Sequence, residues 1–490
     1  MQLKTILKPF TYENHHLIFL NSEIAKELNI EAGEACKVSN KFGSKSAKLI
    51  IDETLKNDQI GILQNLIKDL KINDGEEIDL ENLKTTNSIK YIKKKLDGIA
   101  LNEEEIDSII YDVVNDNLDE ATQAYFIAGC YSNQLSDEET AHLTKAIVKN
   151  GTRLQPGNDQ NIIDKHCIGG VPGNRTTMVV VPIIAAAGLK IPKTSSRAIT
   201  SPAGTADTME CLCNVTVEAD RLEEILKEAN GFISWGGGVD IAAADDKLIR
   251  LRRRVGLDPE GMMLASIMAK KFAAGSKVVL IDIPIGKQAK VKELPDAMNL
   301  KKRFENIGKL LNMQVNVIIT DGSKPIGKGI GPALEAIDVM QVLNLDENAP
   351  KDLREKSLKL SGILLEMAGQ AEVSQGYAMA QEILDSKKAY AKMNEIIELQ
   401  GKNEQIYPFG ENQKEILAET SGIIEEIDIK KLAFTTRQLG CPFDKGSGIY
   451  LHKNAGEEVK KGEKLVTLYA EDKPRLEKTL QNLDLGIIIK

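Results

Sequence analysis

A segment between residues 164 and 210 holds the side chains best suited to bind an oxyanion. It begins with Asp164-Lys165-His166-Cys167-Ile168-Gly169-Gly170-Val171-Pro172-Gly173-Asn174-Arg175-Thr176-Thr177. Glycines and other turn-forming residues let a backbone pass close to a ligand, and the free N–H groups at the start of a helix favour an anion. We expect a helix over residues 176–188, with Lys165 and the two threonines completing an anion cradle.

A second polar segment follows within the same strand and helix unit. It reads Thr194-Ser195-Ser196-Arg197-Ala198-Ile199-Thr200-Ser201-Pro202-Ala203-Gly204-Thr205-Ala206-Asp207-Thr208-Met209-Glu210. A solvated loop has the same composition, so this segment alone does not decide between a loop and a site. Two such loops, each following an apolar segment, favour a phosphate-bearing substrate, because α/β sheets bind ligands beyond the carboxyl ends of their strands.

The segments around these loops predict the framework that positions them. After Gly157, helical patterns over residues 222–229, 248–255 and 262–274 precede an apolar strand over residues 277–282. This alternation predicts a parallel sheet with crossover helices. We therefore expect residues 157–400 to form an α/β domain that binds phosphate and nucleotide.

Three further domains are predicted from changes of periodicity. Residues 1–86 alternate short apolar runs with glycine turns and contain one helix after Asn21, which predicts a small β-rich domain. Residues 87–156 predict a helical domain, with capping boxes at Asn102 to Glu105 and at Ser136 to Glu139. Residues 401–490 are predicted to form a β-rich C-terminal domain.

Composition excludes several classes of protein. The 490 residues are too many for one hydrophobic core, and the net charge of −9 without a basic tract argues against a nucleic-acid partner. We expect a cytoplasmic protein without membrane contact, since there is neither a spanning apolar run nor a signal peptide. The six cysteines and five histidines are scattered, so we expect neither disulfides nor a metal site.

One motif is a false match. Gly322-Ser323-Lys324-Pro325-Ile326-Gly327-Lys328-Gly329 approaches a P-loop, but Gly329 stands where that motif needs a Ser or Thr to bind magnesium. We interpret the segment as a turn that leads into a helix beginning at Pro332.

The two polar loops together carry a family resemblance. Asp-Lys-His-x-x-Gly-Gly-Val, followed by Ser-x-Arg-x-x-x-x-x-x-Gly-Thr-x-Asp-x-x-Glu, resembles the thymidine and pyrimidine nucleoside phosphorylase family. This variant of the motif has Cys167, Pro172 and Asn174, and residues 196–202 read Ser-Arg-Ala-Ile-Thr-Ser-Pro. In these features it resembles the archaeal AMP phosphorylase branch of that family. The resemblance covers the whole chain, including an N-terminal extension that the bacterial pyrimidine enzymes lack.

The resemblance implies a multidomain α/β architecture. The N-terminal domain is expected to resemble the aspartate decarboxylase barrel and to serve assembly, and the C-terminal domain to be α/β and hammerhead-like. Residues 245–275 are expected to return to the helical domain, so that the active site is a cleft between the helical and α/β domains. A homodimer or larger homo-oligomer is implied.

The implied activity is phosphorolysis of AMP, which gives adenine and α-D-ribose 1,5-bisphosphate, with CMP and UMP as further substrates. It belongs to nucleotide salvage and degradation and needs no cofactor, because inorganic phosphate is a co-substrate. The nearest alternative is a thymidine or pyrimidine nucleoside phosphorylase. More distant alternatives are a phosphoribosyltransferase of the anthranilate type, which uses magnesium and pyrophosphate, and a nucleotide-binding scaffold.

The resemblance also assigns residues. It implies that inorganic phosphate is bound by Lys165, Thr177, Ser195 and Thr205. It implies that the nucleotide is bound by Gly170, Ser196, Arg197, Ala198, Ile199, Thr200, Ser201, Thr205, Ser266, Lys270 and Lys290. From its local sequence alone, a solvated lysine is the favoured interpretation of Lys290.

Asp258 is the implied proton donor to the leaving base. It also fits the start of a helix, with Pro259 at the first helical position, and the two roles are compatible. The arginines at 252–254 are left without a role. Cys167 stands where the pyrimidine enzymes usually carry Ser or Thr, and a thiol is the weaker donor.

Overall fold

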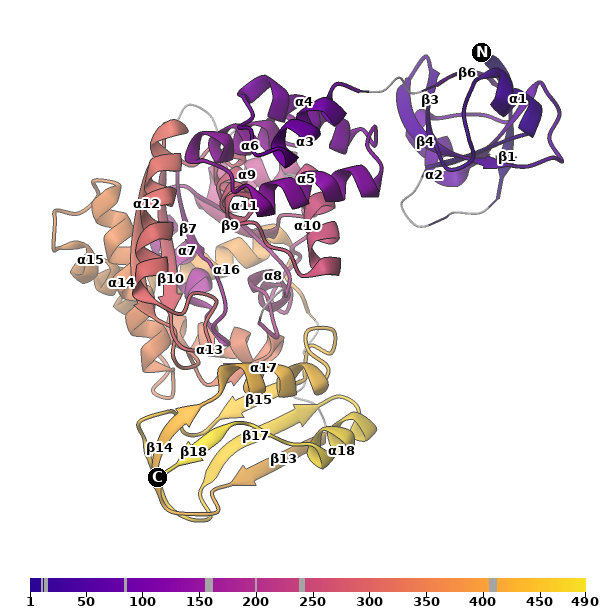
Figure 1. Ribbon diagram of the computed structural model, residues 1–490. Coiled ribbons are helices and arrows are strands. Elements are labelled where there is room, and N and C mark those ends of the chain that lie inside the picture. Colours follow the sequence, from indigo (N-terminus) through magenta and orange to yellow (C-terminus); the bar gives the residue numbers. More distant parts are fainter. Residues whose placement is uncertain are drawn as a thin grey trace. The chain divides into compact units, whose positions relative to one another are not determined.

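The computed structural model describes residues 1–9, 12, 16–82, 86–154, 162–198, 201–237, 243–404 and 412–490, with the backbone alone at 243, 246, 253 and 255 (Figure 1). The chain divides into two compact units. One consists of Met1–Gly151 and Ala243–Ser266, and the other of Thr152–Ala242 and Ile267–Lys490. Among the described residues, no helix is both long and apolar enough to cross a membrane.

The first unit begins with a closed β-barrel. Its strands are ordered β1-β5-β2-β4-β3-β6, with bounds β1 (Gln2–Lys8), β2 (Leu17–Leu20), β3 (Ala35–Asn40), β4 (Gly43–Ile51), β5 (Gln59–Leu63) and β6 (Glu77–Asn82). The predicted helix after Asn21 is α1 (Ser22–Glu27), whose first turn is capped by the Asn21 side chain. The prediction of a single helix is wrong, because α2 (Gln64–Leu70) follows β5 directly. Its two buried leucines, four residues apart, continue the apolar run of β5 and hide the change of period.

The rest of this unit is helical. Its helices are α3 (Ser88–Leu96), α4 (Glu103–Val114), α5 (Glu120–Ser132), α6 (Asp137–Lys149), α10 (Ala243–Val255) and the beginning of α11 (Glu260–Ala273). Both predicted capping boxes are present, at the starts of α4 and α6. Lys247 fastens α10 to the end of α4 by donating to the carbonyl oxygens of Val113 and Val114 at 3.2 and 2.9 Å.

The second unit contains the expected parallel sheet. Strands β7 (Ile163–Cys167), β10 (Val278–Ile285) and β11 (Gln314–Asp321) pair in the order β11-β10-β7, and β8 (Ile191–Ser195) pairs with β9 (Gly231–Trp235). A parallel bridge between Ile162 and Lys190 joins β7 to β8. The predicted α/β fold is therefore confirmed, and the two polar loops leave adjacent strands.

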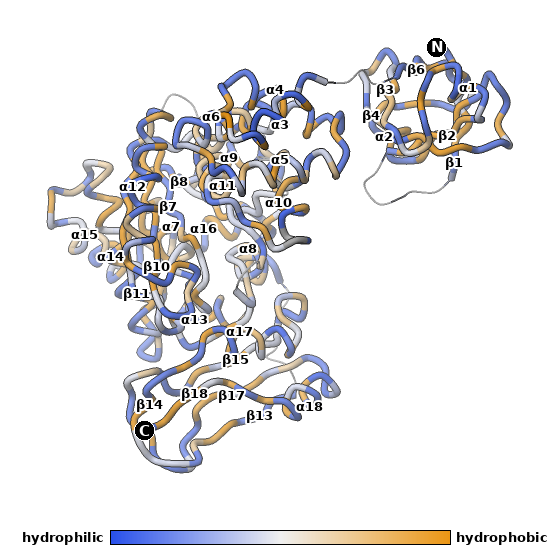
Figure 2. Tube along the Cα trace, viewed as in Figure 1, coloured by the Kyte–Doolittle hydropathy of each residue, from blue (hydrophilic) through white to orange (hydrophobic). Residues whose placement is uncertain are grey.

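The second unit also contains eight described helices that pack around this sheet or against one another. They are α7 (Thr176–Ala186), α8 (Thr205–Met209), α9 (Ala219–Ala229), α12 (Leu294–Leu310), α13 (Pro332–Asn344), α14 (Lys351–Met367), α15 (Gly376–Asp385) and α16 (Lys388–Gln400). Hydrophobic residues run along β10 and α7, which are almost wholly buried (Figure 2). The helix predicted over residues 176–188 ends at Ala186, because Gly188 takes a left-handed φ of +86°.

Two small antiparallel sheets form the C-terminal part. β12 (Gly329–Ile330), which precedes α13, pairs with β15 (Gly448–Leu451) in a sheet completed by β17 (Lys464–Ala470) and β13 (Asn412–Leu417). The other sheet contains β14 (Gly422–Ile427), β16 (Glu458–Val459) and β18 (Ile487–Ile489), and the helices are α17 (Ile429–Gln438) and α18 (Lys473–Gln481). A predicted β-rich end is thus present, with two helices added.

Candidate active site

Lys165 lies at the base of the first polar loop. It extends from β7 with only 1% of its surface exposed, and its Nζ donates to Thr176 Oγ1 at 2.8 Å. Thr176 Oγ1 donates to Asn174 Oδ1 at 3.0 Å, so the lysine is tied to the first residue of α7 and to the loop before it. Burial lowers the pKa of Lys165. A nearby anion would compensate for that burial by stabilising the ammonium form.

Asp282 and Lys356 surround this lysine and were not predicted as site residues. Thr320 Oγ1 donates to Asp282 Oδ1 at 2.6 Å, and Lys356 Nζ lies 3.1 Å from Asp282 Oδ2. Although burial opposes it, the charges of Lys165 and Lys356 hold the pKa of Asp282 below its usual value. Two lysines thus share one carboxylate, which leaves a net positive charge at the carboxyl end of the sheet.

The neighbouring Cys167 thiol is neutral. Burial and the charge of Asp282 raise its pKa, and Asn174 Nδ2 lies 3.4 Å from its sulfur. The thiol therefore contributes polarity but no charge to the loop.

Glycines let this loop approach two other segments of the α/β domain. Gly170 has φ of +92°, and a Cβ there would come within 2.8 Å of the Lys290 amide nitrogen. Gly173 has φ of +71° and packs against the Ile326 carbonyl. The backbone of Lys290 thus lies against the loop at Gly170, while the Lys290 side chain is exposed.

Asp207 organises the second polar loop. Its Oδ2 accepts the backbone N–H groups of Ala198 and Gly204 at 2.7 and 2.8 Å. Gly204 is required because a Cβ there would lie 2.5 Å from the Ser196 carbonyl oxygen. Residues 199 and 200, predicted to bind nucleotide, lie outside the described residues.

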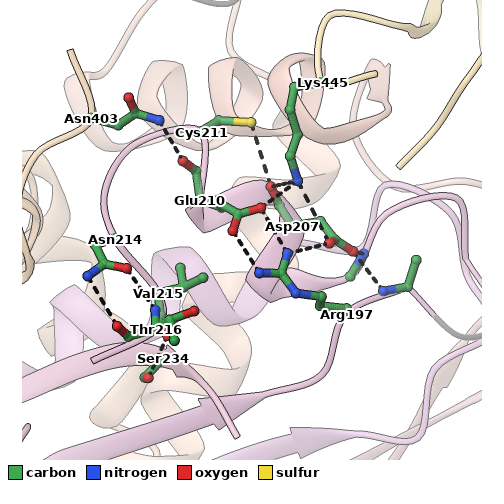
Figure 3. A network of polar contacts seen from close by, with 12 residues as sticks. Arg197, Asp207, Glu210, Cys211, Asn214, Val215, Thr216, Ser234, Asn403 and Lys445 are labelled. Atoms are coloured by element: carbon green, nitrogen blue, oxygen red, sulfur yellow. Dashed lines mark hydrogen bonds and ion pairs between the residues drawn. The ribbon is translucent and has the colours of Figure 1, made fainter. Parts of the chain in front are cut away.

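Arg197 of this loop is held by protein carboxylates (Figure 3). Its Nη1 and Nη2 donate to Glu210 at 2.8 and 2.7 Å, and Nη1 also donates to Asp207 at 3.2 Å. Its guanidinium lies 4.8 Å from the centre of the Trp235 ring. Hydrogen bonding from Arg197, with help from Lys445, lowers the pKa of Glu210 to about 2.

Arg175 joins the two loops and was also missed. Its guanidinium donates to Thr205 Oγ1 at 3.3 Å and to the Ala203 carbonyl, and it pairs with the buried Glu335 of α13. A cation just before the positive end of a helix is unfavourable unless it has partners. The position of Arg175 directly before α7 was therefore the sequence feature that could have identified it.

The remaining predicted phosphate ligands lie on these same elements. Thr177 is the second residue of α7 and is 7% exposed. Ser195 ends β8, and Thr205 begins α8. Lys165, Thr177, Ser195 and Thr205 thus lie on β7, α7, β8 and α8, the elements that border the two polar loops.

Asp258 and Ser266 belong to the other compact unit, where a polar chain connects them. Arg252 donates to Asp258 Oδ1 at 3.0 Å and lies 3.7 Å from Asp245, which accepts the Ser266 hydroxyl at 2.6 Å. Asp258 is 51% exposed, and Arg252 is buried. Lys270 lies one turn beyond Ser266 on α11. Arg252, which is buried, therefore belongs to this chain of contacts.

No cluster of three or more His, Cys, Asp or Glu placed to hold a metal ion occurs among the described residues. The donors around the two loops are ammonium, guanidinium, hydroxyl and backbone N–H groups. Such donors suit an oxyanion rather than a cation.

Three family models match successive parts of the chain. The Glycosyl transferase family helical bundle domain matches residues 89–151, and the a/b domain of the same family matches residues 159–390. The Pyrimidine nucleoside phosphorylase C-terminal domain matches residues 423–490.

Solved structures share the fold. Anthranilate phosphoribosyltransferase from Thermus thermophilus superimposes with a TM-score of 0.54 and 18% identity, over 63% of this chain and 99% of that one. The enzyme of the same name from Saccharomyces cerevisiae gives a TM-score of 0.51 at 16% identity, over 65% of this chain and 98% of that one.

Full-length relatives are much more similar in sequence. The AMP phosphorylase of Pyrococcus furiosus is 42% identical, that of Pyrococcus horikoshii 43% and that of Methanococcus maripaludis 40%. In each case the match covers 94% of this chain and 92% of the relative. This confirms the resemblance inferred from the two loops: the chain belongs to the AMP phosphorylase family, within the wider group of glycosyl transferases whose helical bundle and a/b domains it contains.

Proposed function

We propose that this chain catalyses phosphorolysis of AMP to adenine and α-D-ribose 1,5-bisphosphate, and that it also accepts CMP and UMP. The observation that carries the proposal is the pair of joined loops at the ends of β7 and β8, with buried Lys165 beneath them. The full-length relatives, all called AMP phosphorylase, support the choice of substrate. A cytoplasmic location and a homo-oligomeric assembly are part of the same proposal.

In the proposed reaction, an oxygen of inorganic phosphate attacks C1′ of the ribose. The new O–C1′ bond forms as the C1′–N9 bond breaks, and the bonding electrons leave with adenine. Phosphate is therefore consumed as a co-substrate, and we propose no further cofactor. The 5′-phosphate of AMP remains on the ribose and becomes the second phosphate of the product.

The proposed phosphate ligands are Lys165, Thr177, Ser195 and Thr205. Lys165 supplies charge, and the hydroxyls supply directed donors to an anion with several acceptor oxygens. The Asp282 carboxylate, which also pairs with Lys356, favours the charged form of Lys165. The three side chains keep one net positive charge, and the hydrogen bonds that fix Lys165 and Thr176 orient the donors before phosphate binds.

The proposed nucleotide ligands are those of the second loop together with Gly170, Ser266, Lys270 and Lys290. Arg197 has its Nη atoms on Glu210 and Asp207. We therefore propose that Arg197 shapes the loop around the 5′-phosphate, and that any direct contact with that phosphate must compete with Glu210.

Asp258 is the proposed general acid, which protonates N7 of adenine as the bond to ribose breaks. Adenine leaves poorly as an anion, so this proton lowers the barrier. The acid role requires the Asp258 carboxyl group to reach the base, whereas in this structure it accepts a hydrogen bond from Arg252 at 3.0 Å. The proposal therefore includes separation of Asp258 from Arg252 when the nucleotide binds.

The rival activities differ in their co-substrate or in their need for the 5′-phosphate. The likeness to anthranilate phosphoribosyltransferases is a likeness of fold at 16–18% identity. A thymidine or pyrimidine nucleoside phosphorylase shares the phosphate loop but does not need a 5′-phosphate, and the similarity to AMP phosphorylases disfavours it.

The test is to incubate the protein with AMP in the presence and absence of inorganic phosphate and follow the products by ³¹P NMR and by chromatography of the base. We expect adenine and a ribose bisphosphate in equal amounts, only with phosphate present. Release of adenine without phosphate, or reaction of phosphate-free samples with pyrophosphate and magnesium, would contradict the proposal.

A further inference from the structure

Lys445 of the C-terminal domain contacts the second polar loop from outside the α/β domain. It lies in the turn between α17 and β15, and its Nζ is 2.7 Å from Glu210 Oε2 and 3.8 Å from Asp207 Oδ1. The Lys445 side chain is 14% exposed. Figure 3 shows the ammonium group reaching the same carboxylates that Arg197 contacts from the opposite side.

The C-terminal domain contacts the loop at a second point. Arg437, in the last turn of α17, donates from Nη2 to the Ser201 carbonyl at 3.2 Å. The backbone of Lys445 is itself anchored, because the Ala333 N–H donates to its carbonyl at 3.1 Å. A fixed backbone places the lysine side chain where it meets the loop.

The charges in this network balance in pairs. Arg197 and Lys445 supply two positive charges, and Asp207 and Glu210 supply two negative charges. Without Lys445, two neighbouring carboxylates would share one guanidinium, and like charges at this distance repel. Glu210 would then draw Arg197 away from Asp207, whose Oδ2 holds the Ala198 and Gly204 amides in place.

We propose that Lys445 is a positioning residue for the AMP-binding loop: by neutralising Glu210 it keeps Arg197 and Asp207 in the arrangement that holds the Ala198 and Gly204 amides in place. This inference rests on the proposed function for its kinetic consequence, but not for its structural one. The C-terminal domain thereby contributes to nucleotide binding through one side chain that touches no substrate.

Three variants test the proposal in the full-length chain. Lys445→Met removes the charge and keeps the length of the side chain, and Lys445→Arg restores a cation able to reach Glu210. Lys431→Met is the matched control, because Lys431 forms an exposed ion pair with Asp484 on the same domain. For each, KM for AMP, KM for phosphate, kcat and the melting temperature are measured.

Trp235 provides a readout that needs no activity. It is the only tryptophan of the chain, and the Arg197 guanidinium stacks on its ring. Quenching of its fluorescence by acrylamide therefore reports how firmly Arg197 is held. Lys445→Met should increase this quenching, whereas Lys445→Arg and Lys431→Met should leave it as in the wild type.

We expect Lys445→Met to raise KM for AMP about tenfold, the size of loss typical of a charge-assisted contact left unmade, with a smaller change for phosphate. Lys445→Arg should recover most of this loss. Wild-type KM and quenching in Lys445→Met, or a lowered melting temperature alone, would overturn the proposal. If the wild type does not act on AMP, the proposed function fails, and the fluorescence comparison still decides the role of Lys445.

Discussion

At the scale of single residues, the site depends on buried charged side chains that stabilise one another electrostatically. Lys165 of β7 and Lys356 of α14 share Asp282 of β10. A lone buried ammonium group would lose its proton, whereas one beside a carboxylate and an incoming phosphate keeps it. The phosphate therefore completes a network that the protein has only partly neutralised.

Replacing Lys165 by methionine tests this account. The loss of one charge-assisted contact should cost on the order of 1.5 to 3 kcal/mol in phosphate binding, which is roughly a tenfold to hundredfold rise in KM for phosphate. KM for AMP should change less. Lys227→Met is the control, because Lys227 is an exposed lysine of α9 in the same domain. Equal phosphate KM in the two variants would refute the role of Lys165.

Asp258 is the residue whose proposed role is most open to direct test. Asp258→Asn keeps the shape of the side chain and can still accept from Arg252, so the protein should fold normally. Turnover of AMP should fall by about 10² to 10⁴, the usual contribution of a general acid. A purely structural Asp258 instead predicts near-normal kcat in Asp258→Asn and a lower melting temperature in Asp258→Ala. Measuring kcat and melting temperature for both variants separates the two roles.

At the scale of elements, the two loops are held together by side chains that come from distant parts of the sequence. Arg175 of the first loop donates to the Ala203 carbonyl and to Thr205 Oγ1 of the second loop. The same guanidinium forms an ion pair with Glu335 of α13. Lys445 adds a contact from the turn after α17. Loops that lie on rigid strands and are tied in this way can present donors without first being ordered by the substrate.

The ion pair of Glu210 predicts a pH dependence of stability. Its folded pKa of about 2 lies below the ordinary value of 4.5, so its contribution is fully present above pH 4.5 and is lost as the pH falls toward 2. The melting temperature of Glu210→Gln should therefore lie below that of the wild type at pH 7, with the difference shrinking between pH 4.5 and 2. Glu224→Gln, which breaks an exposed pair with Arg221, should show little difference at any pH. A constant gap for Glu210→Gln across this range would contradict the assignment.

Local signals in the sequence predicted the elements better than the contacts between them. The capping boxes of α4 and α6 and the glycine-rich loop before α7 depend on residues a few positions apart, and each was found from the sequence. Helix α2 was missed because its apolar residues follow those of β5 without a break. Arg175 with Glu335, and Lys445 with Glu210, join residues far apart in the chain, and a sequence pattern carries no record of such pairs.

At the scale of the whole molecule, we propose that the N-terminal barrel serves assembly. Its six strands close on themselves and enclose their own hydrophobic core, which includes Ile18, Leu49, Ile60 and Leu80. None of the residues proposed to bind phosphate or nucleotide lies in it. A domain with its own core can be removed without exposing the core of another.

Deletion of residues 1–84 should therefore leave an active enzyme of smaller assembly size. We expect light scattering to show a loss of mass greater than that of the deleted residues, because a larger oligomer would dissociate to a catalytic dimer. kcat for AMP should stay close to that of the full-length chain. Unchanged oligomer number after the deletion would show that the barrel has no part in assembly.

The central claim is that the enzyme requires the 5′-phosphate of its substrate, and competition between AMP and thymidine in one reaction measures this directly. Both substrates are supplied at equal concentration with excess inorganic phosphate, and the initial rates of adenine and thymine release give the ratio of their kcat/KM values. Because an empty phosphate subsite forfeits on the order of 1.5 to 3 kcal/mol, AMP should be preferred at least tenfold, and up to about a hundredfold from that contact alone. Equal release of the two bases, or a preference for thymidine, would contradict the account.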